Sequence, residues 1–411
     1  MDDSGRTTKV YYLLFALLVL PFFKTSYIDH YEIPDLIFNI ARVMASIAIL
    51  VLTALAKRRI DKQTILLLVL FAWLLLMTAI NEGPILDVVQ YYGFGLCAFL
   101  LIGLFSKKPG IIIDVLFVLG EILVYTNLIT QILFPDGLYV SKLLHNYHNW
   151  ILGFKNQFLP FYLCFGVAAG LKIASGSKTV RPVALIVCMA VSMFLGKSAS
   201  GIISFFIFLA IFAIVGFKRK IRINPAILFA ITVIAFVLLV IVSDNEILLG
   251  TVASFSNKDA TFTGRTSIWA TAMTLIAARP LVGWGVMTDE AHIQLMGIPD
   301  AGSTHDYYLE LMLSGGVVSI GLYIAFFVLM IVMLNKKKSS FAAQILAAAL
   351  FALTIAFIVE SFVNPVIFLL YGLACNVDSF VSPERQEGDL MRYLKGIKGH
   401  FVARKKSRSK S

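Results

Sequence analysis

The chain has 411 residues, of which 59 % are apolar and 14 % charged, with 35 basic residues against 24 acidic ones. Soluble domains carry about a quarter charged residues and disordered chains are poor in apolar ones, so both classes are excluded. The composition predicts a polytopic membrane protein. The net charge of +11 would also suit nucleic acid, and the positions of the charges decide between the two readings.

Apolar runs long enough to cross about 30 Å of hydrocarbon recur along the chain. They lack the alternation of membrane β-barrel strands, so we expect helices. The predicted fold is all-α, a bundle of about twelve transmembrane helices with one long extracytoplasmic loop that contains short helices. The predicted spans are 10–26, 36–56, 64–80, 89–105, 111–134, 157–172, 182–195, 201–217, 223–243, 306–334, 341–359 and 365–380.

Basic residues gather before the first span, in every second connection and in the C-terminal tail, which together hold 27 of the 35. By the positive-inside rule this side is cytoplasmic, and both termini lie on it. The charge excess then reflects topology and attraction to lipid headgroups, and no nucleic-acid partner is expected. Arg42 lies within a span, and seven basic residues remain outside: Lys24, Lys142, Lys155, Lys197, Lys258, Arg265 and Arg279.

The span pattern divides the chain into four parts. Residues 1–243 form an N-terminal bundle of nine spans, and residues 244–305 form an extracytoplasmic loop that carries part of the site. Residues 306–380 add three spans, and residues 381–411 are a basic cytoplasmic tail. Function is expected in the long loop, because non-helical backbone must lie outside the lipid or in a cavity.

The long loop contains a predicted amphipathic helix that lies on the membrane. Thr263 or Thr266 would cap it, and Pro280 would end it. Arg265 stands at its N-terminus, where a guanidinium joins free backbone N–H groups and suits an anion such as phosphate; a solvated loop arginine is the alternative. The apolar face of the helix comprises Ile268, Trp269, Ala272, Met273 and Ile276.

His305 opens the tenth span at the expected outer membrane boundary, in or near the first helical turn. The positive end of a helix disfavours imidazolium, so a neutral ring that can accept a proton is expected there. A capping or interfacial histidine is the alternative. Lys197, in the short connection between spans seven and eight, is a candidate second phosphate ligand or a snorkelling lysine.

Two charges fall within predicted spans. Arg42 lies in the second span and Glu121 in the fifth. Intramembrane charges usually face the interior of a bundle, so the two either form a structural ion pair or line a polar cleft that opens outward.

The remaining histidines and the cysteines carry weaker signals. His145 and His148 could form a metal pair in the loop 135–156, but no convergent carboxylate accompanies them and no metal or other cofactor is expected. Stacking of sugars on the aromatic residues of that loop is the other reading. His30, His292 and His400 are expected at the surface. The cysteines lie within predicted spans and are expected to pack there as small apolar residues; they are Cys97, Cys164, Cys188 and Cys375.

Three motifs follow one another in the segment from Gly196 to about Leu322. Together they resemble the O-antigen ligase and polysaccharide polymerase superfamily of bacterial membranes. The motifs are Gly264-Arg265 with Trp269, then Pro280-Leu281-Val282-Gly283-Trp284-Gly285, then His305-Asp306 with Tyr308-Leu309 and Gly316.

This resemblance implies a metal-independent glycosyltransferase of the bacterial cytoplasmic membrane. Its donor is a glycan on undecaprenyl pyrophosphate, and its partners are a lipid-linked acceptor, membrane lipids, a chain-length regulator and a flippase. In the family, arginines hold the pyrophosphate and the loop histidine activates the acceptor hydroxyl, which makes His305 the catalytic candidate. Transfer would proceed by displacement with inversion. The candidate pyrophosphate ligands are Arg265, Lys197, Arg279 and Arg42.

The sequence departs from the family pattern at three positions. Asp306 replaces the usual asparagine, Lys197 stands where an arginine is frequent, and Ser314 replaces a frequent glutamate. Three functions remain open: a polymerase that joins lipid-linked repeat units into a surface polysaccharide, a ligase that moves glycan onto lipid core, wall or protein, and a transporter of lipid-linked glycan. The transporter is disfavoured because no internal repeat is visible.

Overall fold

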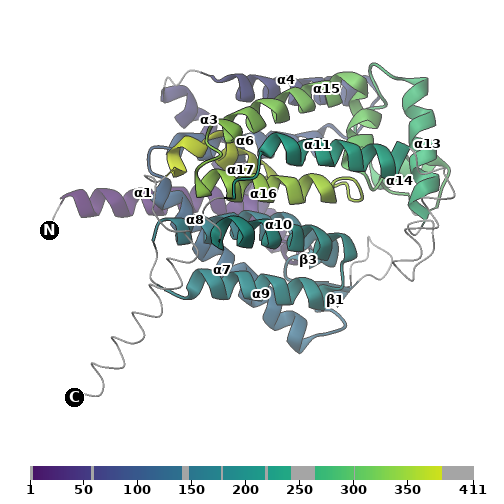
Figure 1. The fold of residues 1–411 in the computed structure, drawn as a ribbon. Coiled ribbons are helices and arrows are strands. Elements are labelled where there is room, and N and C mark those ends of the chain that lie inside the picture. Colours follow the sequence, from purple (N-terminus) through teal and green to yellow (C-terminus); the bar gives the residue numbers. More distant parts are fainter. Residues whose placement is uncertain are drawn as a thin grey trace, which may run out of the picture.

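The structure, a computed structural model, describes residues 3–56, 60–140, 148–176, 179–217, 221–241, 264–299 and 301–381. Most of these residues are helical (Figure 1). Among the described residues, seven helices are long and apolar enough to cross a membrane: Glu32–Leu55, Lys62–Ile80, Ile85–Phe105, Pro109–Leu133, Lys155–Ala174, Ala199–Phe217 and Tyr307–Lys336. Five shorter apolar helices accompany them: Thr8–Phe23, Arg181–Gly196, Pro225–Ile241, Phe341–Ala356 and Pro365–Cys375.

These segments coincide in order with the twelve predicted spans, and the chain is a multi-pass helical membrane protein; twelve complete crossings remain a prediction. In the first half of the chain the elements are α1 (Asp3–Val19), η1 (Leu20–Phe23), α2 (Ser26–Asp29), α3 (Glu32–Leu55), α4 (Lys62–Ile80), α5 (Ile85–Val88), η2 (Val89–Gly93), α6 (Phe94–Phe105), α7 (Pro109–Leu133), β1 (Tyr139–Val140), β2 (His148–Trp150), β3 (Gly153–Phe154), η3 (Lys155–Gln157) and α8 (Phe158–Ala174). In the second half they are α9 (Arg181–Gly196), α10 (Ala199–Phe217), α11 (Pro225–Phe236), η4 (Val237–Ile241), α13 (Arg265–Ala278), α14 (Asp289–Met296), α15 (Tyr307–Lys336), α16 (Phe341–Ala356), α17 (Pro365–Cys375) and η6 (Val377–Phe380).

Burial separates inner from outer helices. Every residue of α17 is buried, and in α8 only Lys172 is not, as expected for helices that are apolar all round. By contrast, α3 exposes Ile33, Leu36 and Ile37, which suits a face turned to lipid. All four cysteines are free, and Cys188 alone among them is only half-buried.

Basic residues of several predicted cytoplasmic connections meet at one end of the bundle. Lys108 Nζ lies 4.0 Å above the ring of Tyr11, and Lys172 pairs with Asp114. Lys337 pairs with Asp378 of η6 across 3.2 Å. The start of α1 and η6 therefore lie at the same end, away from α13 (Figure 1). That this end faces the cytoplasm remains a prediction.

The opposite end carries the elements between the predicted spans. The short antiparallel strands form a sheet in the order β1-β2-β3, and α13 runs crosswise to the long helices (Figure 1). The predicted helix is present as α13, which buries Ile268, Trp269 and Ala272 of the predicted apolar face and leaves Met273 and Ile276 half-buried. That it is amphipathic and lies on the membrane stays a prediction. Thr266 lies within the helix and does not cap it; Gly264, with φ +83°, is the residue before its first turn. Thr263 lies outside the described residues.

The helix α15 is broken near its outer end. Gly315 and Gly316 leave helical geometry, and Gly316 has φ +65°. The segment 280–285 fills the break: the N–H of Trp284 donates to the carbonyl of Leu313 across 2.8 Å, and the N–H of Val317 donates to the carbonyl of Pro280 across 2.8 Å. We call segments 280–285 and 313–317 the glycine clamp. It pairs the backbone groups that the break would otherwise leave free.

Glycine is required in the clamp by close backbone contact. A Cβ on Gly316 would lie 2.2 Å from the carbonyl oxygen of Leu281, and one on Gly283 would lie 2.5 Å from that of Leu313. Both residues also have positive φ, which side chains disfavour. The Pro-Leu-Val-Gly-Trp-Gly motif therefore builds the scaffold of the loop.

The two intramembrane charges do not pair with each other. Glu121 accepts from Arg181 Nε across 2.9 Å, because α7 packs against α9. Arg42 Nε donates to the carbonyl of Pro21 across 3.2 Å, and its guanidinium lies 5.4 Å from the centre of the Phe94 ring. The predicted Arg42–Glu121 pair is wrong, since each charge has a nearer partner on the helix that packs beside it.

Candidate active site

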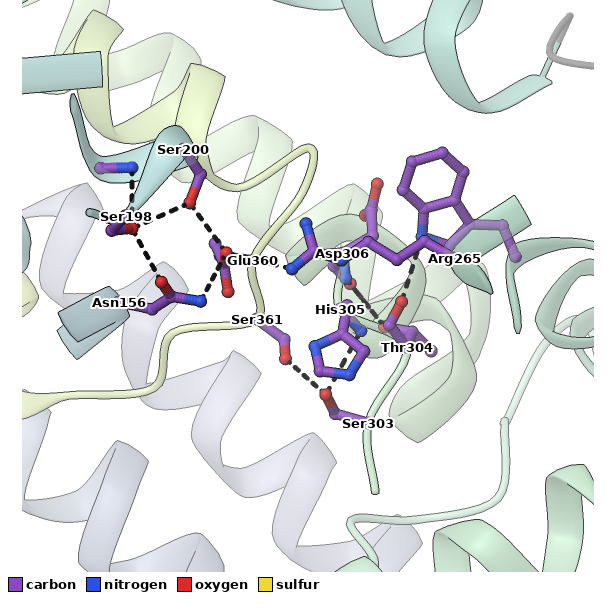
Figure 2. Close-up of polar contacts among 12 residues, drawn as sticks. Asn156, Ser198, Ser200, Arg265, Ser303, Thr304, His305, Asp306, Glu360 and Ser361 are labelled. Carbon is purple, nitrogen blue, oxygen red and sulfur yellow. Dashed lines mark hydrogen bonds and ion pairs between the residues drawn. The ribbon is translucent and has the colours of Figure 1, made fainter. Parts of the chain in front are cut away.

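The centre of the candidate site is a buried carboxylate, Glu360, in the connection between α16 and α17. Its Oε1 accepts from Arg265 Nη2 across 3.2 Å, from Ser200 Oγ across 2.8 Å and from Asn156 Nδ2 across 3.0 Å (Figure 2). A buried charge is costly unless it is paired and hydrogen-bonded. Glu360 therefore gathers four segments that are distant in sequence.

Lys197 borders this network without entering it. Ser198 Oγ donates to Asn156 Oδ1 across 2.7 Å, so the α9–α10 turn is fastened to the Glu360 cluster. Lys197 closes α9 in the left-handed region with φ +54°, and its side chain is exposed. An exposed cation beside the network is free to meet an anionic ligand.

His305 stands just before α15. It has φ +50°, and Asp306 caps the helix by accepting from the N–H of Leu309 across 2.8 Å. Asp306 is fully buried. The histidine was expected in or near the first turn, and the structure places it two residues before the turn begins.

The surroundings of His305 connect it to the Glu360 cluster. The N–H of His305 donates to Ser303 Oγ across 3.3 Å, and Ser303 pairs with Ser361 Oγ across 3.0 Å. Glu360 and Ser361 are neighbours in the connection between α16 and α17. This connection therefore contacts both Arg265 and the segment 303–305, which contains His305 (Figure 2). Arg265 and His305 are thus the two candidate residues that the fold brings together.

The electrostatics make His305 a neutral imidazole. Burial lowers its pKa, the nearby guanidinium of Arg265 lowers it further, and the pKa reaches about 4. The ring is therefore unprotonated at neutral pH and can accept a proton. This agrees with the neutral ring expected from the sequence.

The other two candidate ligands have separate partners. Arg279 follows α13, whose 14 residues place it about 20 Å along the helix from Arg265. Its Nη1 donates to Asn81 Oδ1 across 2.7 Å, and its guanidinium lies 3.9 Å from the centre of the Trp284 ring. Arg42 contacts η1 and α6, as described above. Neither takes part in the Glu360 cluster.

Sequence reasoning missed Glu360 and Asn156. A signal for Glu360 was present, because it is the one carboxylate in the short outward connection 360–364 between the last two predicted spans. For Asn156, an uncharged residue in a loop, no such signal exists. Its partners Ser198 and Glu360 lie 42 and 204 residues away along the chain.

The weaker predictions have mixed outcomes. His30 is exposed as expected, but His292 was wrongly expected at the surface, since it is only 2 % exposed. Trp150 is buried and donates to the carbonyl of Phe134 across 2.8 Å, so it offers no free face for a sugar. His145 and His400 lie outside the described residues, and His148 is exposed.

In the part of the chain that the structure describes, no group of three His, Cys, Asp or Glu side chains comes together that could hold a metal ion. Independence from metal stays a prediction.

Part of this site lies in a segment that matches a known protein family. Residues 184–324 match the O-antigen ligase family. This confirms the resemblance to the O-antigen ligase and polymerase superfamily. The matched segment contains Lys197, Arg265, the glycine clamp and His305, whereas Asn156 and Glu360 lie outside it. No curated protein matches the chain.

Proposed function

We propose that the protein polymerises undecaprenyl-pyrophosphate-linked oligosaccharide repeat units into a cell-surface polysaccharide. The observation that carries the proposal is the juxtaposition of a cation, Arg265, with a neutral half-buried histidine, His305, inside a segment of the O-antigen ligase family. A pyrophosphate leaving group needs positive charge, and an acceptor hydroxyl needs a base. The site offers both.

In the proposed reaction, the acceptor hydroxyl oxygen bonds to the anomeric carbon of the donor. The bond between that carbon and the pyrophosphate oxygen breaks, and undecaprenyl pyrophosphate leaves with the electron pair. The hydroxyl proton passes to the ring of His305. Attack opposite the leaving group inverts the anomeric configuration. No part of this proposed step requires a metal ion.

Arg265 would stabilise the charge that develops on the pyrophosphate. Its contact with Glu360 orients the guanidinium before substrate arrives, while donors of the guanidinium that Glu360 does not use remain for phosphate oxygens. Lys197 is the second proposed ligand, because it is exposed at the edge of the same cluster. Arg42 and Arg279 become weaker proposals, since each is engaged elsewhere.

The proposal includes a place in the cell. The site would face outward from the bacterial cytoplasmic membrane, with both termini in the cytoplasm. A flippase would deliver the lipid-linked units, and a chain-length regulator would act on the product.

A ligase is the second candidate, because the matching family is described as O-antigen ligase. It would use the same donor chemistry with a lipid core, wall or protein acceptor. A transporter of lipid-linked glycan would need no base at His305.

The test gives the purified protein, in lipid nanodiscs, one defined lipid-linked repeat unit and no other acceptor. We expect a ladder of longer lipid-linked products. Product that forms only after a core acceptor is added would replace the polymerase with the ligase. Passage of the unit across liposomes with no new bond would support transport instead.

Variants then test the roles of the site residues. His305→Asn removes the base while keeping a side chain that tolerates positive φ, and we expect transfer to fall at least about 100-fold. Arg265→Ala should reduce it by a similar factor. The control is Glu290→Gln, an exposed carboxylate on α14, which should match the wild type. Full activity in His305→Asn would reject the proposed mechanism.

A further inference from the structure

His292 of α14 is a buried histidine outside the proposed reaction. Its Nδ1 lies 2.8 Å from the carbonyl oxygen of Ala301, and its Nε2 lies 3.4 Å from Oε2 of Glu310. The carbonyl accepts a hydrogen bond from a protonated Nδ1. Nε2 makes no hydrogen bond in the described residues, but it lies within ion-pair distance of a carboxylate, which favours a proton on Nε2 as well. The geometry therefore favours the imidazolium form.

Glu310 connects the ring of His292 to the segment that leads into His305. It lies in the first turn of α15, and its Oε2 also accepts from the N–H of Thr304 across 2.8 Å. His292 holds Ala301 directly and holds Thr304 through Glu310. The segment 301–304, which leads into His305, is thus fastened at both ends by one pair of side chains.

The fastening matters because His305 has φ +50°. A non-glycine residue in a sparsely populated region costs of order 1–3 kcal/mol and persists only when its surroundings enforce it. On the other side of the loop, Trp269 Nε1 donates to the carbonyl of Thr304 across 3.1 Å. Thr304, the residue before the histidine, is therefore held through both its N–H and its carbonyl.

We propose that His292 and Glu310 are a positioning pair that holds His305 in its active orientation while His292 is protonated. The inference rests on the proposed function, because it needs His305 to act as the base. Neither residue belongs to the motifs that carried the family resemblance.

The pair gives the site a dependence on pH. Burial lowers the pKa of His292, but the nearby carboxylate of Glu310, the carbonyl of Ala301 and the charge of Asp289 outweigh burial and raise the pKa above its usual value. Glu310 from α15 and Asp289 from α14 itself are the carboxylates that face it, and His305 is the neighbouring ring.

The sign follows from the direction of that shift. The protonated form, and with it the fastening, is present at low pH and is lost as pH rises through the raised pKa. Nδ1 keeps its proton for Ala301, so Nε2 is the nitrogen that loses one. Its lone pair then faces the Glu310 carboxylate, and the repulsion frees Thr304. Activity should therefore fall on the alkaline side.

Two substitutions of Glu310 separate positioning from folding. Glu310→Ala leaves Thr304 and His292 without a partner, and we expect kcat to fall about tenfold or more, since small misplacements of a catalytic group have effects up to about 100-fold. The KM for the lipid-linked donor should stay within about twofold of wild type, because Arg265 is untouched. Glu310→Gln can accept from Thr304 and donate to a neutral His292, so it should restore most of kcat and abolish the alkaline fall.

The assay is the nanodisc polymerisation reaction, run across pH beside Glu290→Gln as matched control and His305→Asn. Unchanged kcat in Glu310→Ala, or an unchanged alkaline fall in Glu310→Gln, with His305→Asn inactive, would overturn the positioning pair and leave the proposed function standing. A fully active His305→Asn would overturn both. If Glu310→Ala does not fold, the pH profile of Glu310→Gln decides alone.

Discussion

Asp306 follows the proposed base His305 and is one of the positions at which the sequence departs from the O-antigen ligase pattern. Its Oδ1 caps α15, while its Oδ2 is buried with no hydrogen-bond partner among the residues that the structure describes. Burial raises the pKa of Asp306 well above its usual value. A protonated aspartate has the shape of asparagine and, like it, one acceptor and a donor. The side chain of Asp306 thus resembles that of asparagine only while it is protonated.

The raised pKa predicts a pH-dependent stability. In the unfolded chain this carboxyl ionises near its ordinary value, so its contribution to folding is complete below that value and is lost as pH rises through the raised pKa of the folded state. Asp306→Asn should therefore raise Tm relative to wild type at mildly alkaline pH, and the difference should shrink toward acidic pH. Thermal unfolding of the purified proteins measures it. A Tm difference that is constant across pH, or a lower Tm in the variant, would contradict the argument.

At the scale of elements, the glycine clamp holds the site together. In the clamp, backbone hydrogen bonds join segment 280–285 to segment 313–317 at the point where α15 is broken. Gly316 has a positive φ, and a Cβ at this position would lie too close to the carbonyl of Leu281. Gly321, one turn further, has open space around its Cβ position and serves as a natural control.

Gly316→Ala should destabilise the protein by more than about 1 kcal/mol, because alanine is strained where φ is positive. It should also reduce transfer, since the outer part of α15 begins next to His305. Gly321→Ala lies in regular helix and should leave the free energy of unfolding equal or slightly higher. Thermal unfolding and the polymerisation assay compare the two. Equal Tm in both variants would mean that the clamp contributes nothing.

At the scale of the whole molecule, the charges define an orientation that can be measured. With the native cysteines replaced by alanine, single cysteines at the exposed positions Glu290 and Lys338 lie in the predicted outer loop and in a predicted cytoplasmic connection. A thiol reagent that cannot cross membranes should label Glu290→Cys in intact cells and Lys338→Cys only after permeabilisation. The reverse pattern would invert the proposed topology and place the site in the cytoplasm.

Much of the fold was predictable because lipid forces each apolar run into a helix. Hydropathy, however, indicates only how deep a residue lies in the membrane. It does not indicate which helices pack beside the one that carries the residue. This is why Arg42 and Glu121 were paired wrongly, and why the Arg265–Glu360 contact between residues 95 positions apart was missed. The burial of His292 was missed for a similar reason: its partners lie on another helix and on a loop carbonyl.

The break in α15 has one more consequence. Residues 307–314 are bonded through the backbone to the segment that follows α13, and Trp73 of α4 donates to the carbonyl of Gly315 across 2.7 Å. The inner part is fastened as well, because the N–H of Val317 donates to the carbonyl of Pro280 and Ser319 Oγ donates to the carbonyl of Leu311 across 2.6 Å. The break therefore joins the loop that contains His305 to two helices long enough to cross the membrane, α4 and α15. A shift of either helix would be passed to the residues around His305.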